Sequence, residues 1–489
     1  MKKFFHQARG ELHNMFNDDS PASSHHHGQQ HVLANPPPPI SAPTRDDIIR
    51  YRYHHGVNLG SVYVLEKWLH PSMFPPDAPP NQTAELAGAT LALKQLGPDG
   101  ARKKFEDHWA NSLTDSDMDW LVNQAHCTSI RLPIGYFTLG PSFCKGTPFD
   151  KVSAVYTNAW SSVRSLVSRC SAHGIGVLVD FHALPGGANG GEHSGTNSGK
   201  AEFWGNKSNV DLANRCLQFI AQEIRHMDGV VGLQLCNEAE YNAAGMYAWY
   251  DSVINQIGAI DNTIPIYISD AWNMGQAVDY IRKKNSLACG YSNPIIIDTH
   301  LYWAFSDADK SKSPQAIIGA VPSTLRELDG KDGNVGDHGA AAAVVGEYSC
   351  VLDGQTWDKS GGASREQLVQ QFGCAQSQRH QQRSGGSYFW TYKMVCPTCS
   401  SICPVFLPFA WPYAQKGWLL TIFSRTGLDG RRRMGLRRND QEKLLHLTSL
   451  SHTRLPRRSA PPRYRFLPAG RKDVRERRQS QQLLELAIS

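Results

Sequence analysis

Short runs of apolar residues alternate with longer amphipathic stretches along the chain from Arg50 to Lys393. Most of the short runs are almost continuously apolar, which is typical of parallel strands covered on both faces. Eight runs are predicted as strands: Gly56–Gly60, Ser129–Ile134, Gly176–His182, Gly232–Glu238, Ile266–Ala271, Ile295–Tyr302, Ala343–Ser349 and Gly386–Tyr392. Since parallel strands need long crossover connections, we expect a helix between successive strands.

The stretches between these strands carry helical spacing. Val152–His173 places apolar residues three to four positions apart, and Val210–His226 follows the same period. Eight strand–helix repeats predict an α/β fold of the (β/α)8 TIM-barrel type. The alternative is a doubly wound open sheet, but no GxGxxG sequence follows the first strand, where that fold would bind a dinucleotide.

Both ends of the chain depart from this pattern. Residues 1–45 are polar and contain His25–His27 and Pro36–Pro39, which predicts a flexible Pro/His-rich tail. Residues 46–394 are assigned to the barrel domain. Residues 395–489 show no sustained period and are rich in Arg, so we expect an aberrant, unfolded tail there.

The positive charge of the chain lies in its last segment. The net charge is +6, but residues 396–489 hold 18 Lys and Arg against 6 Asp and Glu. Residues 1–395 therefore carry a net charge of −6, so nucleic acid is not an expected partner of the barrel. A tail that binds nucleic acid or an anionic membrane is the alternative for residues 396–489.

Composition limits the class of protein further. Hydrophobic residues make up 40% of the chain, yet no apolar run approaches the roughly 18 residues of a membrane span. The start, MKKFFHQARGELHNMF, is basic but lacks the apolar core of a signal peptide. We therefore expect a cytoplasmic protein, with an extracellular or cell-surface location as the alternative.

The 11 cysteines follow no repeating spacing. We expect buried free thiols or one or two bridges. Cys396, Cys399 and Cys403 lack a fourth ligand at a zinc-like spacing, so no metal site is predicted.

Polar residues close several of the predicted strands. In a (β/α)8 barrel the carboxyl ends of the strands meet at one mouth, where catalytic groups lie. The set expected at this mouth is Arg131, His182, Asn237, Glu238, His300, Tyr302, Glu347 and Trp390. Asp180 lies one position further inside its strand and is interpreted as structural.

Two of these residues, Glu238 and Glu347, are carboxylates at the ends of predicted apolar strands. Burying a carboxylate there costs free energy unless it has a chemical function or a partner. A carboxylate pair can perform glycoside hydrolysis without a cofactor: one group protonates the leaving oxygen, and the other attacks or stabilises the sugar. Arg131 and Tyr302 are expected to keep Glu347 ionised. Trp390 offers an apolar face to a sugar ring.

Eight ordered motifs between Arg50 and Met394 resemble glycoside hydrolase family 5, and within it the fungal exo-β-1,3-glucanase branch. The motifs are HHGVNLGSVYVLEKWLHPSMF, FEDHW…LTDSDMDWL, IRLPIGYF, VLVDFHALPGGANG, GLQLCNEAE, IDTHLYW, VVGEYS and YFWTYK. The resemblance implies a TIM barrel and a retaining double displacement on β-glucan, as in a glucan 1,3-β-glucosidase. We expect a monomer that needs no cofactor.

The resemblance also implies roles for single residues. Glu238 matches the acid/base and Glu347 the nucleophile. The positions that match substrate-binding residues are Glu66, Arg131, His182, Asn237, His300, Tyr302 and Trp390. Ala239 stands where the family usually has Pro, and HLYW replaces a more usual HHY. These departures leave a β-1,6-glucanase or a β-glucosidase as alternatives. A non-catalytic carbohydrate-binding protein is a further alternative, if the tail has replaced the last helix.

The C-terminal segment departs most from the family. After YFWTYK the branch usually continues into a stretch resembling WMDGGEWGF, whereas this chain has GLDGRRRMGLRR. One set of codons for Gly430–Leu436 reads in another frame as Met-Asp-Gly-Gly-Glu-Trp-Gly-Phe. We therefore hypothesise that Val395 to about Thr426 is a retained intron and that the remainder is out of frame. Splice sites near codon 394 in genomic DNA would support this; a genuine basic tail is the alternative.

Overall fold

Eight parallel strands close into a barrel in the order of the sequence. The structure is a computed structural model that describes residues 42–285, 293–331, 340–395 and 402–404. The barrel strands are β1 (His54–Asn58), β2 (Ser129–Gly135), β3 (Gly176–Ala183), β4 (Val230–Gln234), β5 (Ile266–Ser269), β6 (Ile295–Leu301), β7 (Ala343–Tyr348) and β8 (Gly386–Phe389). The barrel closes where β1 pairs with β8, with His54 opposite Gly386. The predicted TIM-barrel class is confirmed.

The eight predicted strands are all present, but their ends shift. The largest shift is in β4, which ends at Gln234, four residues before the predicted end at Glu238. The chain leaves the ladder there, and Glu238 adopts a left-handed backbone with φ 42°. This turn presents the Glu238 side chain at the barrel mouth instead of continuing the strand.

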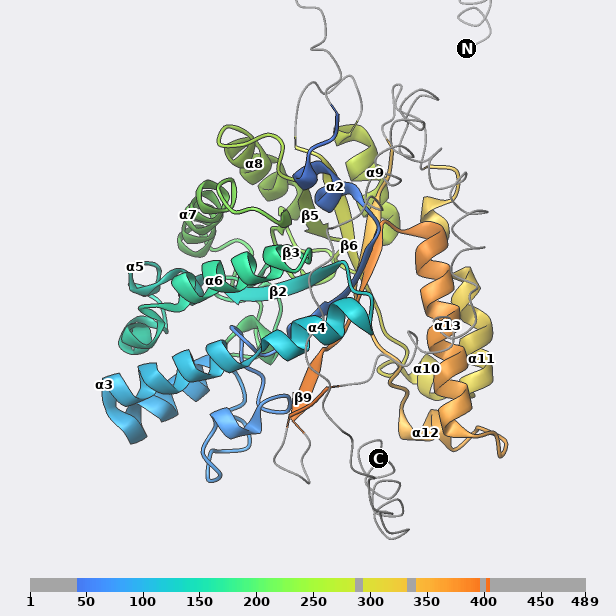
Figure 1. The fold of residues 1–489 in the computed structure, drawn as a ribbon, viewed down its shortest axis with the longest axis horizontal. Coiled ribbons are helices and arrows are strands. Elements are labelled where there is room, and N and C mark those ends of the chain that lie inside the picture. The colour runs from blue at the N-terminus through green and yellow to red at the C-terminus, as the bar shows by residue number, and fades with distance from the viewer. Residues whose placement is uncertain (1–41, 286–292, 332–339, 396–401, 405–489) are drawn as a thin grey trace, which may run out of the picture. The chain divides into compact units, whose positions relative to one another are not determined.

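Helices surround the strands (Figure 1). They are α2 (Arg45–Tyr51), α3 (Glu85–Asn111), α4 (Asp115–Asn123), α5 (Pro141–Cys144), α6 (Ala159–Ala172), α7 (Lys207–Ile224), α8 (Met246–Gly258), α9 (Met274–Lys284), α10 (Asp307–Lys310), α11 (Pro314–Ala320), α12 (Gly354–Trp357) and α13 (Arg365–Arg383). The helix predicted over Val152–His173 is divided into the 3-10 helix η3 (Asp150–Tyr156) and α6. Asn158, with φ −110° and ψ 9°, lies between them.

Helix α2 covers the amino end of the barrel. Its N-cap Thr44 forms a capping box with Asp47, which fixes where the helix starts. Ile49, the buried residue of α2, packs with inward-facing residues of five strands: Leu178, Val231, Tyr267, Val344 and Tyr388. One end of the barrel is thereby filled with apolar side chains, and the polar groups collect at the other end.

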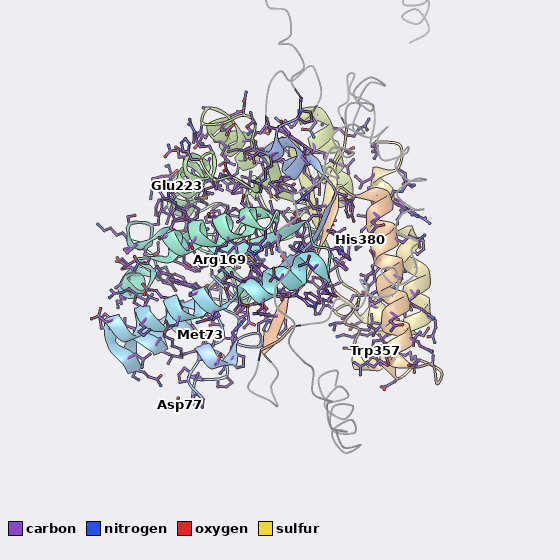
Figure 2. The ribbon with its side chains drawn as sticks, in the orientation of Figure 1. Met73, Asp77, Arg169, Glu223, Trp357 and His380 are labelled. Atoms are coloured by element: carbon purple, nitrogen blue, oxygen red, sulfur yellow. The ribbon has the colours of Figure 1, made fainter. Side chains whose placement is uncertain are left out.

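The outer helices pack on the barrel through buried side chains. Figure 2 labels His380 on α13. Its ring meets that of Tyr348 of β7 edge to face, with ring centroids 4.8 Å apart. Among the described cysteines, seven are free thiols: Cys127, Cys144, Cys170, Cys216, Cys236, Cys350 and Cys374. No helix in the described ranges is long and apolar enough to cross a membrane.

After β8 the chain forms a short antiparallel pair of strands, β9 (Lys393–Val395) and β10 (Ile402–Pro404). The remainder of the predicted Arg-rich tail lies outside the described residues, as do Cys396 and Cys399. The same holds for residues 1–41 of the predicted N-terminal tail.

Candidate active site

A cavity of about 640 Å³ opens at the carboxyl ends of the strands. Eight of the nine predicted site residues line it: Glu66, His182, Asn237, Glu238, His300, Tyr302, Glu347 and Trp390. The ninth, Arg131, is fully buried on β2 and bonds to several of them from below. Positions more than 280 residues apart in the sequence, from Glu66 to Glu347, thus converge on one cavity.

Arg131 organises the floor of the site. Its Nη1 donates hydrogen bonds of 2.9 Å to Glu347 Oε1 and to Asn58 Oδ1, and its Nη2 donates one of 2.7 Å to Asn237 Oδ1. Burial opposes the charge of Arg131, but Asp180, Asp298 and Glu347 outweigh it and raise the pKa of the guanidinium. The cation is therefore permanent and fixes Glu347 by charge and by geometry.

Two strands repeat the same Asp-x-His arrangement. Residues i and i+2 of a strand point to the same face, so each aspartate meets the histidine that follows it. Asp180 Oδ2 lies 2.6 Å from His182 Nδ1 on β3, and Asp298 Oδ2 lies 3.1 Å from His300 Nε2 on β6. Both aspartates also lie within 3.5 Å of Arg131 Nη2. Asp180 therefore has the structural role of holding His182 and Arg131 in place, and Asp298 has the same role for His300 and Arg131.

Asn237 links these two networks. Its Oδ1 accepts from Arg131, which turns its Nδ2 toward His182 Nε2 at 3.3 Å. Asn237 Nδ2 can donate a hydrogen bond to His182 Nε2 when His182 carries its proton on Nδ1, the nitrogen that faces Asp180. The tautomer of His182 and the orientation of the Asn237 amide therefore support each other.

Glu347, the penultimate residue of β7, lies between two hydrogen-bond donors. Oε1 accepts from Arg131, and Oε2 accepts a 2.8 Å hydrogen bond from the hydroxyl of Tyr302. His300 Nδ1 lies 3.6 Å from Oε2. A carboxylate with donors at both oxygens is held in one orientation, as a nucleophile requires.

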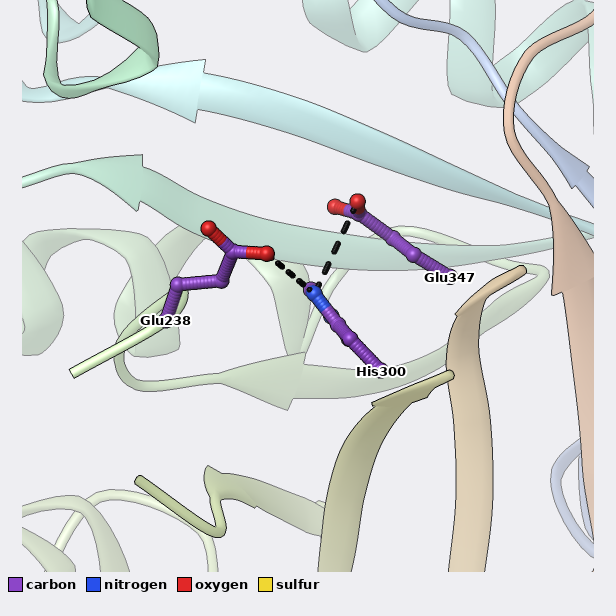
Figure 3. Close-up of side chains that lie close together, drawn as sticks. All are labelled: Glu238, His300 and Glu347. Carbon is purple, nitrogen blue, oxygen red and sulfur yellow. Dashed lines mark hydrogen bonds and ion pairs between the residues drawn. The ribbon is translucent and has the colours of Figure 1, made fainter. Parts of the chain in front are cut away.

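Glu238 lies between two imidazoles. Oε1 faces His300 Nδ1 at 2.8 Å, as Figure 3 shows, and Oε2 faces His193 Nε2 at 3.2 Å. Burial raises the pKa of Glu238, but the two histidines outweigh burial and hold the pKa well below its usual range. Burial likewise opposes the charge of His300, while Glu347, Asp298 and Glu238 raise its pKa well above the ordinary value.

Glu238, His300 and Glu347 offer atoms that all lie within 4.8 Å of one another (Figure 3). Such a triad resembles a metal site in composition. However, both nitrogens of His300 already face carboxylates: Nδ1 faces Glu238 and Nε2 faces Asp298. Ion pairing accounts for the arrangement of these three side chains.

The wall of the cavity carries a buried carboxyl and aromatic rings. Burial raises the pKa of Glu66 to about 7, and the indole nitrogen of Trp68 donates a 2.9 Å hydrogen bond to it. Trp390 stacks on His182, with ring centroids 6.1 Å apart and planes 13° apart. Trp68 and Trp272 are about half exposed at the rim, where rings can contact a sugar or an apolar substituent.

His193 is the lining residue beside Glu238 that the sequence did not indicate. It lies in the short 3-10 helix η4 (Glu192–Ser194), in a glycine-rich loop after β3, and not at a strand end. The spacing around it carries no chemical signature. Its position becomes informative only when the loop folds over Glu238.

Comparisons with known proteins agree with this fold. The family described as Cellulase (glycosyl hydrolase family 5) matches residues 94–384. A Saccharomyces cerevisiae protein described as an uncharacterized glycosyl hydrolase is 33% identical over 357 residues, covering 71% of this chain and 68% of that protein. Glucan 1,3-beta-glucosidase 3 of Schizosaccharomyces pombe is 29% identical, covering 72% and 71%.

Among solved structures, the rutinosidase of Aspergillus niger superposes with a TM-score of 0.56 at 17% identity, covering 71% of this chain and 91% of that one. This likeness concerns the fold alone. The family match and the 33% identical relative go further. The chain belongs to glycoside hydrolase family 5.

Proposed function

We propose that the protein is a retaining β-glucan hydrolase that acts as a glucan exo-1,3-β-glucosidase. The carrying observation is the carboxylate pair: an oxygen of Glu238 lies within 4.8 Å of an oxygen of Glu347. Retaining glycosidases place their two carboxyl groups about 5–5.5 Å apart, whereas inverting enzymes need about 6.5–9.5 Å to fit a water molecule.

The two environments support separate roles in a double displacement. Glu347, oriented by Arg131 and Tyr302, attacks the anomeric carbon and forms a glycosyl-enzyme. Glu238 gives a proton to the glycosidic oxygen as that bond breaks. In the second half Glu238 takes a proton from water, and the resulting hydroxide displaces Glu347 with net retention.

Relatives support the choice of β-1,3-glucan. Proteins named glucan 1,3-beta-glucosidase in Schizosaccharomyces pombe and Yarrowia lipolytica are 29% and 26% identical to this chain. Polar groups suited to sugar hydroxyls, including Glu66 and Asn237, line the cavity beside the broad ring of Trp390. The same cavity would serve a β-1,6-glucanase or a β-glucosidase.

Hydrolysis of laminarin oligosaccharides, followed by proton NMR, tests the proposal. We expect β-glucose as the first product, before mutarotation, and no turnover by Glu347→Gln. An α-anomer would contradict retention. Faster hydrolysis of gentiobiose would indicate a β-1,6-glucanase in place of the proposed β-1,3 preference. Faster hydrolysis of small aryl glucosides would indicate a β-glucosidase. Binding of laminarin without hydrolysis would indicate a non-catalytic carbohydrate-binding protein.

A further inference from the structure

The two imidazoles beside Glu238 differ in their surroundings. His300 faces Oε1 and is anchored at its other nitrogen by Asp298, and its side chain is 4% exposed. His193 faces Oε2, and its side chain is 25% exposed. The Nε2 atom of His193 is buried 3.2 Å from Glu238 Oε2 but does not form an aligned hydrogen bond with it, so the exposed part of the ring lies elsewhere.

This difference bears on a requirement of acid catalysis. Glu238 must carry a proton when the glycosidic bond breaks, yet its pKa is held well below the usual range, so in the free site the proton resides on a neighbour. His300 faces a carboxylate at each ring nitrogen, and only 4% of its side chain is exposed. His193 approaches Glu238 within 3.2 Å and is also partly exposed to solvent.

We propose that His193 supplies Glu238 with the proton that is delivered to the leaving group. This inference rests on the proposed glycosidase function. The proton leaves His193 Nε2 and bonds to Glu238 Oε2, and it then leaves Oε2 as it bonds to the glycosidic oxygen. In the second half-reaction Glu238 takes a proton from the attacking water and passes it back to His193 Nε2.

Several charged groups face His193 and sustain this exchange. Glu66, Glu238 and Glu347 line the same cavity as His193, and Glu192 is the preceding residue. The ring of His182 meets His193 edge to face at 5.6 Å. Burial lowers the pKa of His193, but Glu238, Glu66 and Glu347 outweigh it and raise the pKa to about 9. The pair therefore keeps its proton into alkaline solution.

The kinetic test compares His193→Asn with wild type across pH. Asparagine keeps a polar side chain of similar reach but cannot carry the proton. For laminaribiose, whose leaving group needs protonation, we expect the alkaline limb of kcat/KM to move down by at least one pH unit. For 2,4-dinitrophenyl glucoside, which needs little protonation, it should not move. Equal shifts on both substrates, or none, would overturn the proposal.

His126→Asn is the matched control. His126 is exposed before β2, and its φ of 52° suits asparagine. This variant should retain the wild-type pH profile on both substrates.

A second measurement does not depend on turnover. NMR titration of the His193 imidazole, assigned by its loss in His193→Asn, should give a pKa well above 6.5 in wild type and at least one unit lower in Glu238→Gln. A pKa that is unchanged in Glu238→Gln would overturn the coupling. An inactive wild type with the coupled titration would contradict the glycosidase function while leaving the His193–Glu238 pair established.

Discussion

At the scale of single residues, Glu238 carries the most direct kinetic prediction. Glu238→Ala should slow hydrolysis of laminaribiose by about 10²–10⁴-fold, because general acid catalysis contributes that much. Aryl glucosides with activated leaving groups should lose far less in the bond-breaking step. Steady-state and burst kinetics on both substrates make the comparison. Equal losses in that step would count against Glu238 as the acid.

Arg131 carries a prediction about stability. It is fully buried against Asp180, Asp298 and Glu347, so Arg131→Met leaves three desolvated carboxylates without their cation. We expect the free energy of unfolding to fall by about 3–5 kcal/mol, measured by urea denaturation.

Arg102→Met removes an arginine from the surface pair with Asp99 and serves as the control for Arg131. It should cost less than about 1 kcal/mol, since exposed ion pairs contribute little. Comparable losses in the two arginine variants would show that the buried network is not held together by Arg131.

Most of the residues that sequence reasoning found close or occupy predicted strands, where the (β/α)8 pattern gives their position. Glu66 is the exception: it lies after β1, and the family resemblance indicated it. Asp298 was available from the same pattern, since it precedes His300 by two residues as Asp180 precedes His182. His193 was not available, because no periodicity fixes where a glycine-rich loop folds. Loop positions depend on contacts that form only in three dimensions.

At the scale of elements, Glu85 joins the start of α3 to its neighbours. Its carboxyl accepts a 2.6 Å hydrogen bond from the backbone of Leu65 and a 2.7 Å hydrogen bond from the hydroxyl of Tyr156 in η3. Burial raises its pKa to about 8 despite both contacts. The folded chain thus binds this proton more tightly than the unfolded chain does.

The free energy of unfolding falls as pH rises from about 4.5 to about 8, because Glu85 ionises less readily in the folded chain than in the unfolded chain. Glu85→Gln can accept from Leu65, donate to Tyr156 and carry no charge. Between pH 5 and 8 the variant should therefore lose less unfolding free energy than wild type, by on the order of 1 kcal/mol or more.

Glu366→Gln, at the exposed first turn of α13, is the control for this pH effect, because its carboxyl is not desolvated. Urea titrations of both variants at the two pH values make the measurement. If the unfolding free energy of Glu85→Gln falls between pH 5 and pH 8 as much as that of wild type, the assigned cost of ionising Glu85 is wrong.

Element boundaries show where sequence reasoning fails at this scale. The apolar run Gly232–Glu238 gave the existence of β4 but not its end, because the turn at Glu238 depends on how its side chain is held. The period over Val152–His173 continues through both η3 and α6, so spacing alone could not reveal the break at Asn158.

At the scale of the molecule, the barrel closes without its C-terminal continuation. β8 pairs with both β7 and β1, so the ring of strands is complete before residue 390. A cavity of about 280 Å³, lined in part by Tyr392 and Lys393, lies where the chain leaves the barrel. A chain segment that buried the apolar part of this cavity would stabilise the fold, because it removes apolar surface from water.

We therefore predict that a version of the chain with the alternative reading frame restored after Met394 melts at a higher temperature and aggregates less than the 489-residue chain. Scanning calorimetry and light scattering at matched concentrations make the comparison. If the 489-residue chain is equally soluble, stable and active, the hypothesis of a retained intron is wrong.

The pairing of the first barrel strand with the last also constrains how the chain is made. His54 cannot meet Gly386 until nearly the whole barrel has been synthesised. Until then β1 and its latest neighbour both present unpaired edges, which are templates for association between chains. Ring closure also joins residues of very large sequence separation, which slows folding. During translation, the growing chain should therefore depend on chaperones that shield open sheet edges, and this dependence should end abruptly once β8 has emerged.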